Sequence, residues 1–156
     1  MRKETDFIIS QLNESFKGDP WFGRSITALL NEVDEEMAFI QLKKQHSILE
    51  LVWHMVNWRD FTINSLQPSK PVYHFDENDW RKLDHSDKTL WQQGLQLLSE
   101  TQETLVSLLE QSDDSILEKT VEGRKFDFRY LLYGIIQHDI YHLGQIAYIG
   151  KLLKAS

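Results

Sequence analysis

The sequence contains no cysteine among its 156 residues. This absence excludes disulfide bonds, metal sites built from thiolates and a nucleophilic thiol carried by the chain itself. Any thiol chemistry would therefore need a thiol from outside the protein.

Long hydrophobic runs and long basic blocks are also absent. The longest apolar run near the N-terminus, Phe7 to Ile9, is too short for a signal peptide or a membrane span, so we expect a cytoplasmic protein with no membrane partner. No basic block is longer than the pair Lys43 and Lys44, and the formal net charge is −7. These features argue against nucleic acid as a partner.

What is present is a substantial apolar fraction. Apolar residues make up 41% of the chain and aromatic residues 12%. A chain of this size can bury roughly two-thirds of the surface that it exposes when unfolded. We therefore expect residues 1–156 to form a single domain.

Hydrophobic periodicity predicts an all-α protein. Apolar residues recur at helical spacing over residues 4–17, 46–66, 86–111 and 126–154, and a short helix after Ser25 carries apolar residues as far as Val33. Residues 34–45 have no clean period, 68–85 form a long loop suspected of function, and 117–123 form an extended connection or a short hairpin. The expected fold is a four-helix bundle with long crossover connections.

Histidines lie in the middle of two apolar stripes. Steps of three and four along the last helix select Phe128, Leu131, Ile135, His138, His142, Gln145, Ile149 and Leu152. The 46–66 helix has the stripe Ser47, Leu51, His54, Trp58 and Phe61. His138 and His142, one turn apart, are close enough to bind one metal ion.

These histidines allow two interpretations. A lone buried histidine is more often a hydrogen-bonded core residue, but three unpaired imidazoles in one core would carry an uncompensated desolvation cost. A shared site of His54, His138 and His142 would have three protein ligands, as catalytic sites do. Imidazole suits zinc, nickel, iron and copper, so the ligands alone do not select the metal. His46, His74 and His85 are predicted to be surface residues.

Three polar residues flank these positions. Gln145 is predicted to orient a histidine by hydrogen bonding rather than to bind metal. Asp139 and Glu50 are each either hydrogen-bond partners of the ligands or surface charges, and the surface interpretation is favoured. The segment from His138 to His142 differs from the H-E-x-x-H motif of zinc peptidases because Asp139 stands in place of the glutamate.

Two further groups of side chains are exposed candidates. Tyr133, Tyr141 and Tyr148 share a separate face of the last helix that a partner subunit could cover. Four cations could bind an acidic substrate, although solvation is favoured for each: Arg59, Arg124, Lys125 and Arg129.

Three segments carry a family resemblance. They are GDPWFG at residues 18–23, HSILELVWH at 46–54 followed by Trp58, and HDIYHLGQI at 138–146. In this order they resemble the DinB/YfiT-like superfamily of metal-binding four-helix bundles over essentially the whole chain. The resemblance implies that His54, His138 and His142 bind one divalent metal ion, often nickel or zinc, and that the protein forms a homodimer.

The resemblance also implies an activity. Relatives include transferases and isomerases that use low-molecular-weight thiols such as bacillithiol, mycothiol or glutathione. We therefore predict a metal-dependent enzyme that activates such a thiol for transfer to an electrophilic small molecule. The alternatives are a metal-dependent hydrolase and a non-catalytic bundle whose metal, or whose histidines alone, organise the core.

Overall fold

The computed structural model describes residues 1–67 and 79–156. No β-strand lies among these residues, which confirms the predicted all-α class. The long helices are α1 (Lys3–Lys17), α4 (Ile48–Leu66), α6 (Thr89–Glu110) and α7 (Phe128–Lys154). The shorter elements are α2 (Ile26–Leu30), α3 (Glu35–Ala38) and the 3₁₀ helix η1 (Asp114–Glu118).

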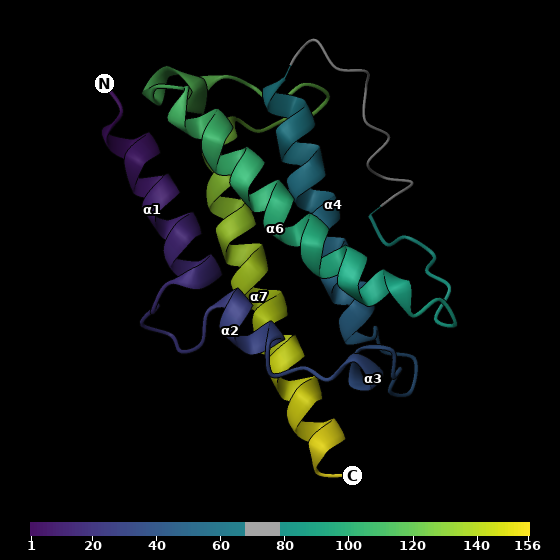
Figure 1. Cartoon of the computed structure of the whole chain (residues 1–156). Helices are drawn as coiled ribbons and strands as arrows, with labels where there is room; N and C mark the ends of the chain where they lie inside the picture. The colour runs from purple at the N-terminus through teal and green to yellow at the C-terminus, as the bar shows by residue number, and fades with distance from the viewer. Residues whose placement is uncertain (68–78) are drawn as a thin grey trace.

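The long helices form a bundle whose neighbours are not simply consecutive. Helices α4 and α1 each pack against both α6 and α7. Helices α4 and α6 run in the same direction, opposite to α1 and α7 (Figure 1). Because α4 and α6 are parallel neighbours, a short turn cannot join the end of one to the start of the other. The predicted long crossover is therefore required by the geometry.

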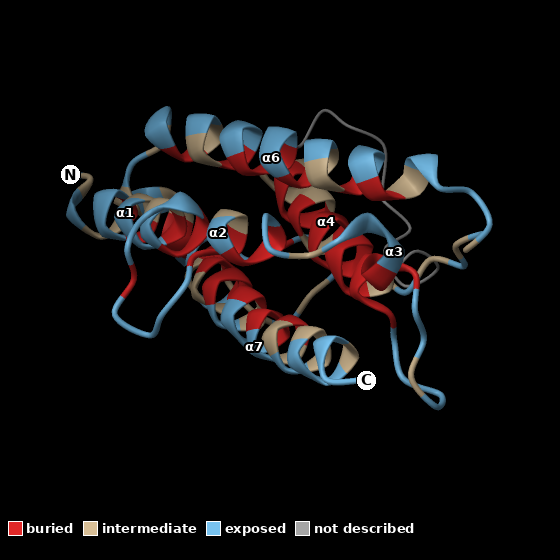
Figure 2. Ribbon diagram, turned by 60° about the horizontal axis from the view of Figure 1, so that its bottom comes forward, coloured by how far each residue is buried: buried red, intermediate tan, exposed pale blue. Residues whose placement is uncertain are grey.

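The core fills the centre of the bundle in two clusters. One joins α4 to α2, α6 and the later turns of α7, with Trp53, Met55 and Leu143 among its members. The other joins α1, α6 and the first turns of α7, with Leu12, Leu105 and Leu132 among its members. Figure 2 shows the buried residues of each long helix facing inward. The helix stripes identified from periodicity are thus the packed faces.

Local signals explain where the helices begin. Ser47 and Glu50 form a capping box at the start of α4, in which each side chain accepts a hydrogen bond from the other residue's backbone N–H. Asp127 caps α7 and Ser25 caps α2 through their side chains. These caps satisfy backbone donors that the first turn of a helix leaves unpaired.

Some predicted boundaries were wrong. The short helix after Ser25 ends at Leu30 and does not include Val33, and α3 lies in the stretch 34–45 that had no period. The stretch 117–123, predicted to be an extended connection or a short hairpin, begins in η1 and contains Thr120, which forms a single antiparallel bridge with Asp127. Most of the predicted 68–85 loop, including His74, lies outside the described residues.

A buried polar network crosses the middle of the bundle. The guanidinium of Arg59 on α4 donates to both carboxylate oxygens of Asp139 on α7, at 2.9 and 2.7 Å. It also donates to Oε1 of Gln102 on α6, whose Nε2 donates to the Leu12 carbonyl on α1. Arg59 and Asp139 are each 1% exposed. The predictions of a solvated Arg59 and of Asp139 as a surface charge are therefore wrong.

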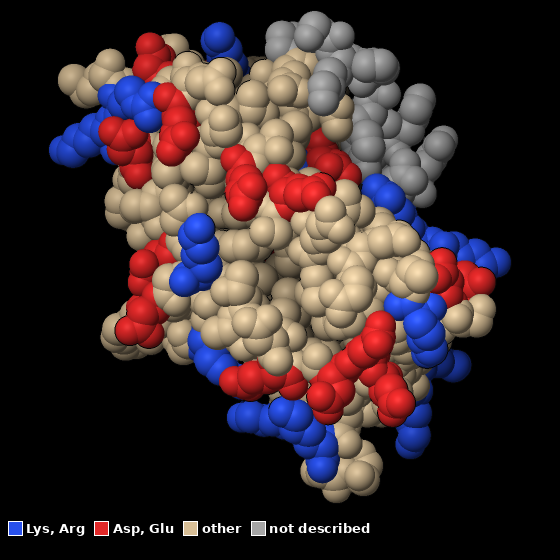
Figure 3. Space-filling view, viewed as in Figure 1, with Lys and Arg blue, Asp and Glu red and all other residues tan. Residues whose placement is uncertain are grey.

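The surface carries mixed charge. Acidic and basic side chains are interspersed over the face in Figure 3, so no extended basic surface lies on the described part of that face. Tyr141 and Tyr148 on α7 are 65% and 66% exposed, whereas Tyr133 is half-buried. A partner subunit over this face stays a prediction. Within the described residues, each helix is too short or too polar to cross a membrane.

Candidate metal centre

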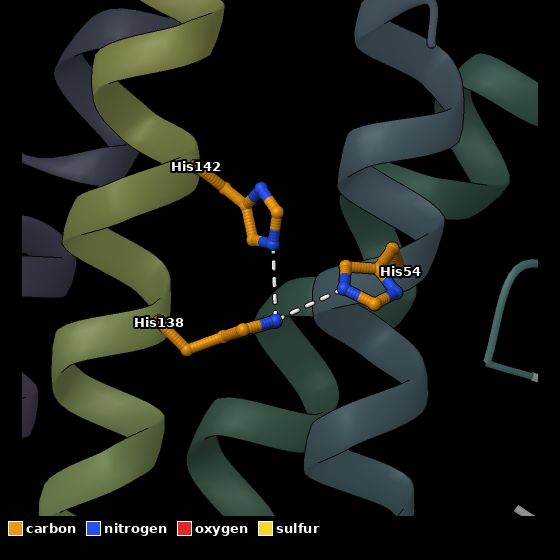
Figure 4. Close-up of side chains that lie close together, drawn as sticks. All are labelled: His54, His138 and His142. Carbon is orange, nitrogen blue, oxygen red and sulfur yellow. Dashed lines mark hydrogen bonds between the residues drawn. The ribbon is translucent and has the colours of Figure 1, made fainter.

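Three histidines from two helices converge between α4 and α7. His138 and His142 project from successive turns of α7 toward His54 on α4 (Figure 4). Nε2 of His138 lies 2.9 Å from Nε2 of His54 and 3.0 Å from Nε2 of His142. The three candidate ligand atoms all lie within 4.8 Å of one another. The structure thus brings together the three residues that the sequence pattern selected.

Two of these imidazoles are held by hydrogen bonds on their other nitrogen. Nδ1 of His54 donates to the Asp79 backbone carbonyl at 2.8 Å and lies 2.9 Å from the Asp79 carboxylate. Nδ1 of His142 donates to Oε1 of Gln145 at 2.6 Å. With the proton on Nδ1, each ring presents the bare lone pair of Nε2 to the centre of the cluster. The orienting role predicted for Gln145 matches this geometry.

This arrangement fits a metal ion. Nε2 of His138 faces two lone pairs and could donate a single proton to only one of them. Two nitrogens bound to one ion at about 2.0–2.1 Å lie about 2.8–3.4 Å apart when the bond angle is between 90° and tetrahedral. The observed separations of 2.9 and 3.0 Å fall in that range. A cation between these rings would satisfy the lone pairs that a single proton cannot.

Burial keeps these imidazoles in the neutral form that binds metal. Desolvation, reinforced by the nearby His142, His54 and Arg59, lowers the pKa of His138 to about 3. Desolvation also lowers the pKa of His54, although its contacts with Asp79 oppose the shift. The pKa of His142 is lowered by burial and partly restored by Gln145. Metal ligation requires deprotonated imidazole, so the site is prepared for an ion at neutral pH.

Trp80 covers one side of the cluster. Its ring stacks on His54 with centroids 3.8 Å apart and on His46 with centroids 3.6 Å apart, each nearly parallel. Asp79 accepts a second hydrogen bond at its carbonyl, from Nδ2 of Asn57. The segment 79–80 therefore supplies both a hydrogen-bond partner and an aromatic cover for His54.

Two pockets meet the cluster from different sides. The smaller, about 160 Å³, is lined by Trp58, Phe126, Tyr130, Leu131, Gly134, Ile135 and His138, and we call it the apolar pocket. The larger, about 390 Å³, has polar and aromatic lining residues Gln45, His46, Trp80, Tyr141, His142, Gln145 and Tyr148, together with aliphatic side chains. His138 and His142 are thus each accessible from a different pocket.

The remaining candidates lie elsewhere. Asp139 is committed to the ion pair with Arg59, which takes both of its carboxylate oxygens. Glu50 accepts hydrogen bonds from the Ser47 backbone and from Gln41. Burial raises the pKa of Glu50, but these hydrogen bonds outweigh it and lower the pKa overall. These hydrogen bonds place Glu50 in the cap of α4.

A family model of the DinB superfamily matches residues 23–146. The chain belongs to the DinB superfamily. No curated protein and no solved structure matches the sequence at a significant level. Membership of the DinB superfamily agrees with the all-helical fold and with a histidine cluster able to hold a divalent metal.

Sequence reasoning missed Asp79 and Trp80 as parts of this site. The only available signal was an aromatic residue in a long loop, since neither residue lies on a periodic helix face. Asp79 acts on His54 mainly through its backbone carbonyl, which every residue type offers. Such a contact leaves no trace in side-chain pattern.

Proposed function

We propose that the protein is an enzyme in which His54, His138 and His142 hold one divalent ion, nickel or zinc, and in which a low-molecular-weight thiol is transferred to an electrophilic small molecule. The observation that carries this proposal is the convergence of the three Nε2 atoms in a cluster that one pocket reaches at His138 and the other at His142. Three protein ligands leave a coordination position open, as in catalytic sites. Membership of the DinB superfamily supports the same conclusion.

The chemistry divides between the ion and the chain. A divalent ion bound by these histidines would lower the pKa of a sulfhydryl, so that the nucleophilic thiolate forms near neutral pH. The Asp79 carbonyl and the Gln145 side chain hold two of the imidazoles in the metal-binding orientation. The larger pocket offers His46 and Gln145 as polar contacts for the remainder of the thiol. The sulfur comes from outside because the chain has no cysteine.

Metal content tests the ligand set. We expect about one divalent ion per chain in the wild type and loss of most of it in His54→Ala, His138→Ala and His142→Ala. His85→Ala is the matched control, because His85 contacts Ser47 and lies outside the cluster. Elemental analysis of the five proteins decides the point. Full metal occupancy in His54→Ala would show that α4 contributes no ligand to the site.

Reaction rates test the chemistry. With 1-chloro-2,4-dinitrobenzene as the electrophile, the thiolate sulfur bonds to the ring carbon that carries chlorine, chloride leaves with the bonding electron pair, and the thiol proton goes to solvent. For a panel of low-molecular-weight thiols, we expect the metal-dependent rate to exceed background most strongly below the thiol's own pKa, about 8.5 for a cysteine-like thiol.

Two outcomes favour the other functions. Metal-dependent cleavage of an ester or amide without thiol would indicate a hydrolase, in which a bound water replaces the thiol. A loaded site that accelerates neither reaction would favour a metal-binding protein without catalysis.

A further inference from the structure

The apolar pocket has a lining that selects against charge. Its described walls are aromatic and aliphatic apart from His138, whose Nε2 faces the histidine cluster. Among residues 1–67 and 79–156, no aspartate, glutamate, lysine or arginine lines it. A charged group buried there would lose its hydration without gaining a partner. The pocket therefore suits an uncharged group.

Its size and walls suit a single ring. The volume is about 160 Å³, and an apolar cavity of about 150 Å³ accommodates benzene. Phe126 and Tyr130 lie with ring centroids 5.3 Å apart, and the Trp58 ring meets His138 at 5.6 Å with an interplanar angle of 60°. Aromatic walls at these angles offer both faces and edges to a guest ring.

A glycine keeps this space open. Gly134 lies within α7, where glycine is unfavourable by about 1 kcal/mol relative to alanine. A Cβ added to Gly134 would meet no atom within 4 Å, so close helix packing does not require glycine at this position. Gly134 lines the apolar pocket, so a larger side chain at this position would take up space in the pocket.

We propose that the apolar pocket binds an uncharged aromatic ring beside His138, and that this ring is the electrophilic substrate's. The assignment to the electrophile rests on the proposed function, whereas the binding of a ring does not. The larger pocket, which reaches His142 and contains polar groups, is left for the thiol. Each substrate would then approach the cluster from its own side.

Binding of fluorobenzene tests the pocket directly. The probe is titrated into metal-free protein without thiol and followed by fluorine NMR. We expect saturable binding to wild type with a dissociation constant of about 1 mM or below. Gly134→Leu should weaken binding by about tenfold or more, because the added side chain occupies the ring's space.

Gly144→Leu is the matched control. Gly144 lies on the same helix, its added Cβ also meets nothing within 4 Å, and it lines neither pocket. It should bind fluorobenzene as the wild type does. Circular dichroism establishes that both variants are folded. If Gly134→Leu is unfolded, contacts between probe protons and the Ile135 methyl groups in wild-type NMR spectra decide the location, and their absence overturns the proposal.

The outcomes separate this inference from the proposed function. Saturable, Gly134-dependent binding of fluorobenzene without any thiol reaction would support the ring-binding pocket and contradict the proposed thiol transfer. A metal-dependent thiol reaction together with unchanged fluorobenzene binding in Gly134→Leu would support the thiol transfer and contradict the ring-binding pocket. If both hold, Gly134→Leu should raise the KM for the aromatic electrophile and leave the KM for the thiol unchanged. An equal rise in both constants would refute the division into two subsites.

Discussion

Arg59 and Asp139 form an ion pair to which water has almost no access. Such a pair stabilises a fold only when hydrogen bonds satisfy both charges, because removing the charges from water is costly. Here the guanidinium is satisfied by Asp139 and Gln102 together. The pair ties α4 to α7, and these are the two helices that carry the candidate ligands.

We predict that breaking this pair one partner at a time is severely destabilising. Arg59→Met and Asp139→Leu should each lower the free energy of unfolding by about 3–5 kcal/mol, because an unpaired charge stays buried. The double variant should be more stable than either single variant, since neither charge remains. Urea unfolding of the three proteins measures these values.

The exposed pair of Arg129 and Glu4 provides the control for that experiment. These side chains are 37% and 34% exposed, so water screens their charges and Arg129→Met should lower stability far less than Arg59→Met does. If Arg59→Met costs no more than Arg129→Met, the buried pair contributes nothing beyond a surface contact.

The lowered pKa of His138 predicts how stability depends on pH in the metal-free protein. Unfolded His138 takes up a proton near pH 6.5, whereas the folded protein resists protonation down to about pH 3. Between these values the unfolded state binds more protons, so stability falls as the pH decreases from about 6.5. At pH 5 the loss due to His138 alone is up to about 2 kcal/mol.

Urea unfolding of chelated protein at pH 7 and pH 5 measures this loss. His138→Gln removes the titrating group, so its stability should change less between the two pH values. Equal changes in wild type and His138→Gln would show that His138 titrates alike in both states.

At the scale of helices, the contact between α4 and α6 depends on a glycine. A Cβ at Gly94 on α6 would lie 2.9 Å from Nε1 of Trp53 on α4. That indole N–H donates to the Leu90 carbonyl at 3.0 Å, which fixes the ring across the helix interface. The close approach of these parallel helices therefore requires the absence of a side chain at residue 94.

Gly94→Ala should be destabilising despite alanine's greater helix propensity. Overpacking against Trp53 costs about 1–3 kcal/mol, which exceeds the helix gain of up to about 1 kcal/mol. Gly144→Ala, where a Cβ meets nothing, should instead raise stability by up to about 1 kcal/mol. Thermal melts of both variants compare the signs. A stabilised Gly94→Ala would mean that Trp53 moves aside freely.

At the scale of the whole molecule, we expect the core to form without a metal. Two buried apolar clusters span the bundle from α1 to α7. Small metal domains unfold without their ion because they bury too little apolar surface alone, whereas a bundle of this size buries enough. The proposed ion would then add to stability by binding the native state only.

We therefore predict that chelation leaves the protein helical at 25 °C but lowers its Tm by several degrees. A ligand present at a hundredfold excess over its Kd adds about 2.7 kcal/mol. Circular dichroism melts before and after chelation measure the change, and His138→Ala should not respond. Loss of helix on chelation would make the ion a structural requirement and weaken the case for catalysis.

Periodicity by itself determined the helices and the positions of the candidate ligands within them. The stripes of α4 and α7 placed His54, His138 and His142 among inward-facing residues, and the structure confirmed that they meet. Spacing along one helix is enough for His138 and His142, because residues four apart share a face. Gln145, one turn after His142, was predictable for the same reason.

Tertiary structure alone decided which polar residues are buried and what completes the site. The burial of Arg59 and Asp139 depends on their pairing across two helices, which the sequence pattern of one helix does not contain. The contact of Asp79 with His54 is made through a backbone carbonyl, which no side-chain pattern reveals. The parallel arrangement of α4 and α6 is likewise seen only in the tertiary structure. A helix's own sequence defines its apolar face, but the identity of what packs against that face is a property of the folded chain.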